Sequence, residues 1–174
     1  MKLSVNRRIA LVSLAILFFD QLTKLLVLSY LGYAQERVVI KGFFKFVHWG
    51  NTGAAWSLFR DHNDLLAIVS LLALLVLFIS RHHFDSGTIW GHVALGLLFG
   101  GIAGNLVDRL HPDRRHVIDF IYFHLTRRSG GEIGFPAFNI ADSAICVGVG
   151  LLFILSWRSE QLRGTERTST APMS

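Results

Sequence analysis

Sulfur is nearly absent from this chain of 174 residues, which has one cysteine, Cys146, inside an apolar run. A single cysteine cannot form an intramolecular disulfide, and no Cys/His spacing typical of a zinc site occurs. Charged side chains are also scarce, at 17% of residues, and they are scattered despite a net formal charge of +5. The scatter argues against nucleic-acid binding, whereas attraction to anionic lipid headgroups accounts for the basic excess.

Common catalytic motifs are missing as well. The sequence contains no Gly-x-Ser-x-Gly nucleophile elbow, no His-Glu-x-x-His zinc motif and no phosphate-binding Gly-x-x-x-x-Gly-Lys. The neighbouring His82 and His83 lie in a polar turn without a third ligand close by in the sequence, which favours solvated histidines over a metal site. We therefore expect no metal ion and no cofactor.

Apolar residues are abundant instead. They make up 52% of the chain, and the mean hydropathy is +0.46, higher than an ordinary soluble domain of this length would show. Since a bilayer crossing needs ~20 residues, the apolar runs predict four membrane-spanning helices, at 9–31, 65–80, 89–107 and 139–157. Basic residues ahead of the first run mimic a secretory signal, but no small-x-small site follows, so we expect this helix to be retained.

Two segments between the runs have a different composition. Residues 36–49 and 117–123 are rich in β-branched and aromatic residues, which predicts short strands, and residues 54–57 predict a short surface helix after a turn. The expected fold class is therefore an all-α membrane protein with four transmembrane helices, a small β-sheet at the bilayer surface and a short interfacial helix. We expect a single domain over 1–158 and a flexible tail over 159–174.

Carboxylates at the edges of these segments carry the functional argument. Asp119 lies in an apolar stretch, and Asp142 stands at the start of the last apolar run. Four spans put both long loops, and hence both aspartates, on one membrane face, although the Lys and Arg distribution does not decide which face. Two carboxyls that meet near a low-dielectric boundary share one proton, which provides a general base and a general acid.

Polar residues at helical spacing accompany these aspartates. Asp20 and Lys24 share a helix face and can pair, either as a buried structural ion pair or to orient site residues. Asn105 and Arg109 also share a face, and Asn139 shares one with the second aspartate. Small residues at four-residue spacing precede Asn105, and such residues let helices pack closely in lipid. They are Gly96, Gly100 and Gly104.

Carboxylates and amides suffice for aspartyl peptide hydrolysis, in which one Asp accepts a proton from water while the other donates one to the scissile carbonyl oxygen. Such carboxylates also occur in ion and proton pathways and as structural pairs. The alternative to an enzyme is therefore a non-enzymatic lipid- or peptide-binding membrane protein, or a carrier, that uses the same polar cluster.

Five short blocks occur in a fixed order along the chain. They are Asp20-Gln21-x-x-Lys24, Asn51-Thr52-Gly53-Ala54-Ala55-x-Ser57, Gly101-x-x-Gly104-Asn105-x-x-Asp108-Arg109, Val117-x-Asp119-Phe120 and Phe138-Asn139-x-Ala141-Asp142-Ser143. In these blocks the chain resembles the bacterial lipoprotein signal peptidases, the type II signal peptidases, a family of intramembrane aspartyl peptidases. The resemblance matches Asp119 and Asp142 to the catalytic dyad. It matches a further set to substrate-binding or site-shaping residues: Asn51, Gly53, Asn105, Arg109, Asn139, Asp20 and Lys24.

The resemblance also implies a setting: a multi-pass protein of the bacterial cytoplasmic (inner) membrane, with its active site and a β-sheet cradle on the extracytoplasmic face. It implies that the substrate is a diacylglyceryl-modified prolipoprotein, cut just before the lipidated lipobox cysteine without a metal. The expected partners are these substrates and membrane lipids, with no nucleic acid, for a monomeric protein. The chain departs from the family at Arg115, where glycine is usual, and in the longer loops 110–116 and 127–134.

Overall fold

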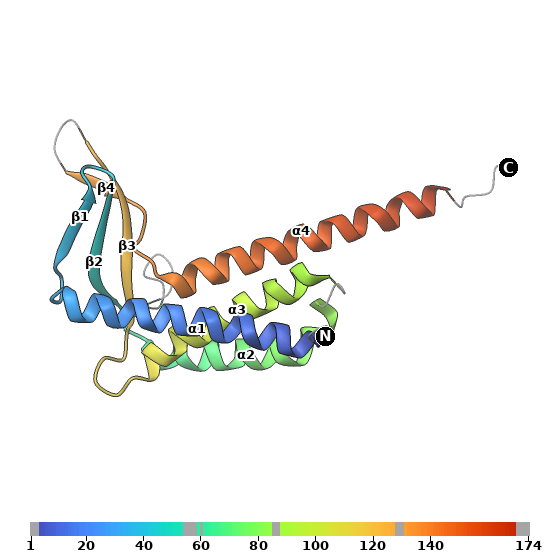
Figure 1. Ribbon diagram of the computed structural model, residues 1–174, viewed down its shortest axis with the longest axis horizontal. Coiled ribbons are helices and arrows are strands. Elements are labelled where there is room, and N and C mark those ends of the chain that lie inside the picture. The colour runs from blue at the N-terminus through green and yellow to red at the C-terminus, as the bar shows by residue number, and fades with distance from the viewer. Residues whose placement is uncertain (1–3, 54–58, 60, 85–87, 128–130, 170–174) are drawn as a thin grey trace.

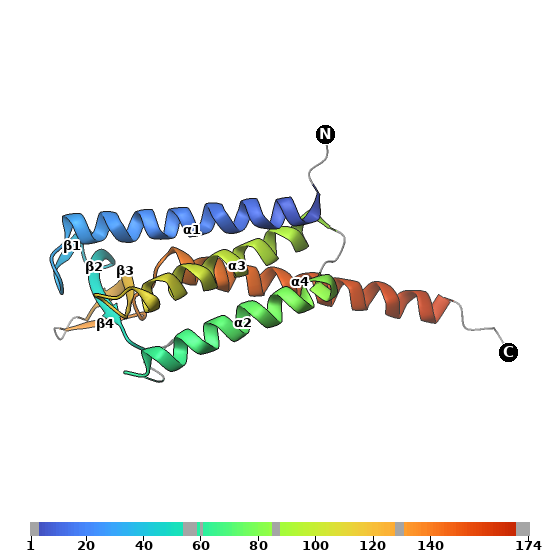
Figure 2. The same ribbon diagram turned by 90° about the horizontal axis from the view of Figure 1, so that it is seen from below.

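A computed structural model describes residues 4–53, 59, 61–84, 88–127 and 131–169 (Figure 1). Four helices in this part of the chain are long and apolar enough to cross a membrane. They are α1 (Val5–Tyr30), α2 (Asn63–Phe84), α3 (Ile89–Leu110) and α4 (Ile140–Ser169). Figure 2 shows α3 between α1 and α2. Because 56% of the apolar window of α3 is buried, against 17% to 22% in the others, α3 is the central helix and the other three mainly face outward.

Glycines let α3 approach both α1 and α4. A Cβ at Gly100 would lie 2.6 Å from the Ser13 carbonyl oxygen of α1, and one at Gly101 would lie 2.6 Å from the Ala141 carbonyl oxygen of α4. A side chain at either position would push the helices apart, whereas glycine allows the backbone contact that stabilises helix pairs in lipid. This packing fixes the end of α3 that carries Asn105 and Arg109.

A four-stranded antiparallel sheet stands at one end of the helices (Figure 1). Its strands follow the order β1 (Glu36–Ile40), β2 (Phe44–Asn51), β3 (Val117–Thr126) and β4 (Glu132–Gly134). The Lys45 ammonium of β2 lies 2.7 Å from Glu36 of β1 and 2.9 Å from Glu132 of β4. One buried cation therefore ties three of the strands together.

The pairing of β2 with β3 contains a bulge. Phe46 lies opposite Ile121 and Trp49 lies opposite Asp119, so β2 takes one more residue than β3 between these two pairs. A bulge of this kind re-aims the side chains around it and is common beside functional sites. It brings Trp49 directly opposite Asp119.

The structure confirms the predicted fold class of four spanning helices with a small sheet. The interfacial helix predicted at 54–57 lies outside the described residues. The helix α3 runs past the predicted end at 107, because the charged side chains of Asp108 and Arg109 find partners inside the protein. The sheet extends further than predicted, since β3 continues to Thr126 and the loop 127–134 supplies β4.

The flexible tail over 159–174 stays a prediction, although α4 continues to Ser169, well past the end of the predicted span at 157. Residues 170–174 lie outside the described range. Adding a residue to an existing helix costs far less than starting one, and no proline interrupts the chain between Trp157 and Pro172. The end of the apolar run is therefore not the end of the helix.

Candidate active site

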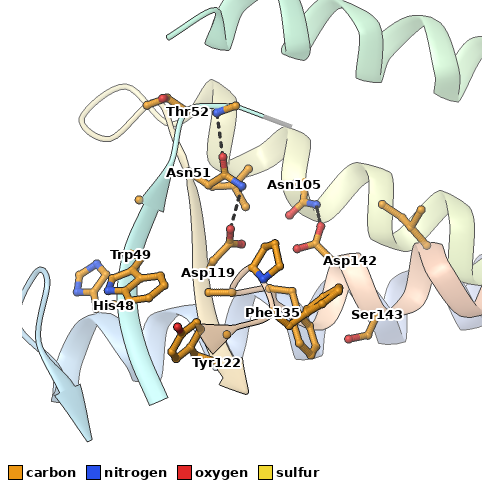
Figure 3. A pocket seen from close by; sticks show the side chains of 18 of the residues that line it. His48, Trp49, Asn51, Thr52, Asn105, Asp119, Tyr122, Phe135, Asp142 and Ser143 are labelled. Atoms are coloured by element: carbon orange, nitrogen blue, oxygen red, sulfur yellow. Dashed lines mark hydrogen bonds between the residues drawn. The ribbon is translucent and has the colours of Figure 1, made fainter. Parts of the chain in front are cut away.

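A cavity of about 1220 Å³ opens where the sheet meets the helix ends (Figure 3). Side chains from β2, β3, α3 and α4 and from the segment 134–138 line it. Six of the residues predicted from the sequence lie in its wall: Asn51, Gly53, Asn105, Arg109, Asp119 and Asp142. Three others are not part of that wall: Asp20, Lys24 and Asn139. The predicted residues therefore divide into a group facing the cavity and a group behind it.

Asp119 enters the cavity from β3. It is 4% exposed, and its carboxylate accepts two hydrogen bonds of 2.9 Å, from the Asn51 side-chain amide to Oδ2 and from the Asn139 side-chain amide to Oδ1. Asn51 Oδ1 in turn accepts the Gly53 backbone N–H at 2.9 Å. Because that bond occupies the amide oxygen, the Asn51 NH₂ group must face Asp119.

Asp142 enters from the first turn of α4. The Asn105 side-chain amide donates to its Oδ1 at 2.7 Å, and the Asn139 backbone N–H donates to its Oδ2 at 3.2 Å. The Asp142 backbone N–H returns a 2.8 Å bond to Asn139 Oδ1. This reciprocal arrangement is a capping box, which starts α4 and fixes the carboxylate at the same time.

The two carboxylates share surroundings although they come from different elements. Both Asp119 and Asp142 line the cavity (Figure 3), and Asn139 donates a hydrogen bond to each of them. Burial raises the pKa of Asp119 to about 7, and the charge of Asp142 adds to the rise. Burial therefore favours the protonated form of Asp119 below neutral pH, next to a second carboxylate that accepts hydrogen bonds from amides.

A buried ion cluster lies behind the cavity wall. The Lys24 ammonium is 2.8 Å from Asp20 and 2.7 Å from Asp108, and it donates to Asn105 Oδ1 at 3.1 Å. The pairing of Asp20 with Lys24 predicted from their spacing is thus present. Asp20 also accepts the Ala141 backbone N–H at 3.0 Å, which joins α1 to the start of α4. The cluster orients Asn105 and α4, and through them Asp142.

Sequence reasoning missed two residues of this site. Asp108 was not among the predicted site residues, whereas it is the second partner of Lys24. Its place in the block shared with Asn105 was the available signal. Asn63, at the start of α2, accepts from the Arg109 guanidinium at 3.2 Å and donates to the Arg109 carbonyl oxygen at 2.9 Å. No signal in the sequence marked Asn63.

Arg109 also contacts the loop after β2. Its NH2 donates to the Gly53 carbonyl oxygen at 2.7 Å. The same glycine holds the Asn51 amide, so a chain of contacts runs from α2 through Arg109 and Gly53 to Asp119.

Within the described residues, no three His, Cys, Asp or Glu side chains gather as a metal site would require.

Comparison with known proteins places the chain in a family. Residues 12–158 match the model of signal peptidase (SPase) II. The chain belongs to this signal peptidase II family. A curated lipoprotein signal peptidase of Pseudomonas putida is 38% identical over 153 residues, which are 86% of each protein. One from Bacillus velezensis is 35% identical over 144 residues, which are 83% of this chain and 90% of the relative.

Solved structures agree with this assignment. One described as a bacterial membrane enzyme has a TM-score of 0.70 and 28% identity, and the match covers 94% of this chain and 93% of that one. A second with the same description has a TM-score of 0.67 and 30% identity, covering 83% and 88%. The signal peptidase II family member described here is therefore a protease and a multi-pass membrane protein, as the resemblance in sequence predicts.

Proposed function

We propose that this protein is an aspartyl endopeptidase that removes signal peptides from diacylglyceryl-modified prolipoproteins, cutting just before the lipidated cysteine. The observation that carries the proposal is the meeting of Asp119 and Asp142 in one cavity, with each carboxylate held by amide donors. Its relatives in Pseudomonas and Bacillus are named lipoprotein signal peptidases, which supports the substrate class.

The proposed mechanism assigns a different role to each aspartate. Asp119, with its pKa of about 7, is the acid that protonates the scissile carbonyl oxygen. Asp142 is the base: the Asn105 amide and the Asn139 N–H hold its carboxylate in place, and it accepts a proton from the attacking water. Attack yields a tetrahedral diol. When the diol collapses, the C–N bond breaks, Asp142 gives its proton to the leaving amine, and Asp119 takes a proton from a hydroxyl of the diol, which restores the starting state of both aspartates.

The surrounding residues position the dyad and the substrate. We assign Asn51, Asn105 and Asn139 to holding the carboxylates, and Arg109 and Gly53 to shaping the cavity wall. The expected setting is the cytoplasmic membrane of a bacterium, with the cavity facing the extracytoplasmic side. A lipid-anchored substrate fits a cavity at the junction of spanning helices and a sheet, because its scissile bond lies at the membrane boundary.

Cleavage of a purified diacylglyceryl-modified prolipoprotein by the reconstituted protein tests the proposal. Asp119→Asn and Asp142→Asn should each lower kcat by about 10³-fold or more, within the range that general acid–base groups contribute. Asp113→Asn, in an exposed loop, is the control and should cleave at the normal rate. Binding of the substrate without any cleavage by the unaltered protein would favour a carrier, and full activity of either dyad variant would remove that residue from the mechanism.

A further inference from the structure

The cavity continues past the dyad toward the sheet. Trp49 and Tyr122 line it there, with their ring centroids 4.8 Å apart, and His48 lies beside Trp49 (Figure 3). Tyr33 completes this end, with its ring edge-on to His48 at 5.5 Å. We call these four residues the aromatic end of the cavity. The proposed mechanism assigns no chemical step to any of them.

The bulge in β2 builds this end. Neighbouring side chains of a regular strand point to opposite faces of the sheet. His48 and Trp49 are neighbours, yet both line the cavity, and they lie where β2 takes its extra residue between Phe46 and Trp49. A bulge that turns two consecutive side chains toward one space is typical of sites that contact a ligand.

The His48 ring is held in one orientation. Its Nδ1 lies 3.0 Å from the Leu31 carbonyl oxygen, which can only accept, so Nδ1 carries the hydrogen. In the neutral ring Nε2 is then an acceptor, and within the described residues the only side-chain hydrogen bond of His48 is the one at Nδ1. The aromatic end therefore offers one open acceptor between flat apolar rings, a combination suited to a peptide N–H and its neighbouring side chains.

The opposite end of the cavity has another character. Ile145, Cys146 and Val147 line it from α4, within the membrane-spanning part of that helix. An apolar signal peptide belongs on that side. The polypeptide after the scissile bond leaves the membrane, and the sheet lies on the side where it leaves.

We propose that the aromatic end is a subsite for the first residues after the lipidated cysteine, with His48 Nε2 accepting a backbone N–H from them. This inference rests on the proposed function. It adds that the enzyme recognises the exported polypeptide itself, besides the lipidated cysteine and the signal peptide.

Two substrates that differ only after the scissile bond test the subsite. One ends at the lipidated cysteine as an amide, and the other continues for several residues. The unaltered protein should show a kcat/KM about three- to tenfold higher for the longer substrate, the range expected for one or two weak contacts. In His48→Asn the side-chain amide can still donate to Leu31, but nothing replaces Nε2, so the preference should fall toward one.

Matched variants separate recognition from support of the fold. In His48→Gln an amide oxygen can reach the place of Nε2, and part of the preference should return. His62→Asn, at an exposed position that does not line the cavity, should keep the full preference. An equal loss for both substrates in His48→Asn, or an unchanged preference, would overturn the subsite. If the His48 test fails while the Asp119 and Asp142 variants are inactive, only the subsite is contradicted and the proposed function stands. If the Asp119 and Asp142 variants remain active, the proposed function itself is contradicted.

Discussion

Replacement of Asp119 by asparagine should change stability with opposite signs at low and high pH. The pKa of Asp119 is about 7 in the folded protein and 3.8 in an unfolded chain, a difference of about 3 units or about 4 kcal/mol. Between these values the folded protein keeps a proton that the unfolded chain has lost. Stability conferred at low pH is therefore lost as the pH rises from about 4 to about 7, and the asparagine variant escapes that loss.

The substitution also has a cost that does not depend on pH. Both carboxylate oxygens of Asp119 accept an amide N–H, one from Asn51 and one from Asn139. The NH₂ group of an asparagine cannot accept, so one buried donor loses its partner at a cost of about 1–3 kcal/mol. The variant should then be less stable by this amount near pH 4. Near pH 8 it should be more stable by a similar amount, because the gain of about 4 kcal/mol exceeds the cost.

Thermal unfolding in detergent, followed by tryptophan fluorescence, measures this reversal. For a chain of this length about 1 kcal/mol corresponds to about 2–4 °C in Tm. Asp113→Asn, at an exposed loop position, is the control and should show no reversal. A Tm difference of the same sign and size at both pH values would refute the argument that burial raises the Asp119 pKa.

The other predictions concern the rate and the packing behind the site. The cleavage rate should fall as the pH rises above about 7, because Asp119 then loses the proton it must donate; a rate that stays level up to pH 9 would contradict this. Gly100→Leu should lower activity by separating α1 from α3, whereas Gly150→Leu, with open space around its Cβ position, should not. Lys24→Met leaves two buried carboxylates without their cation and should destabilise the protein by about 3–5 kcal/mol, seen as a lower Tm. Asn63→Ala should lower kcat while leaving the helices folded by circular dichroism, because the guanidinium that holds the loop after β2 loses one of its anchors.

Contacts within one helix could be predicted from the sequence. Asp20 and Lys24 are four residues apart, and the helical period alone brings them to one face, where they lie 2.8 Å apart. The same period links Asn139 to Asp142 in the capping box. Lipid makes such polar residues conspicuous, since each needs a partner or a function in an apolar run. The candidate site was therefore visible as a set of residues before its geometry was known.

Contacts between elements could not be predicted in the same way. Asp108 meets Lys24 only because α1 and α3 pack at one particular rotation about their axes. The bulge that turns His48 and Trp49 toward the cavity depends on the strand register, and a change of one residue would reverse the faces. The helix beyond Trp157 was missed because hydropathy marks where an apolar run ends, which differs from where backbone hydrogen bonding ends.

Amide donors, and no ammonium group, bind the carboxylate oxygens of Asp119 and Asp142 directly. If an ammonium bound Asp119 directly, both carboxylates would ionise easily and no proton would be left to donate. Amides of Asn51, Asn105 and Asn139 occupy the carboxylate oxygens without adding charge. Lys24 meanwhile reaches Asn105 and orients its amide toward Asp142. In the proposed mechanism, a site built in this way holds two acids in fixed positions and leaves one proton for them to share.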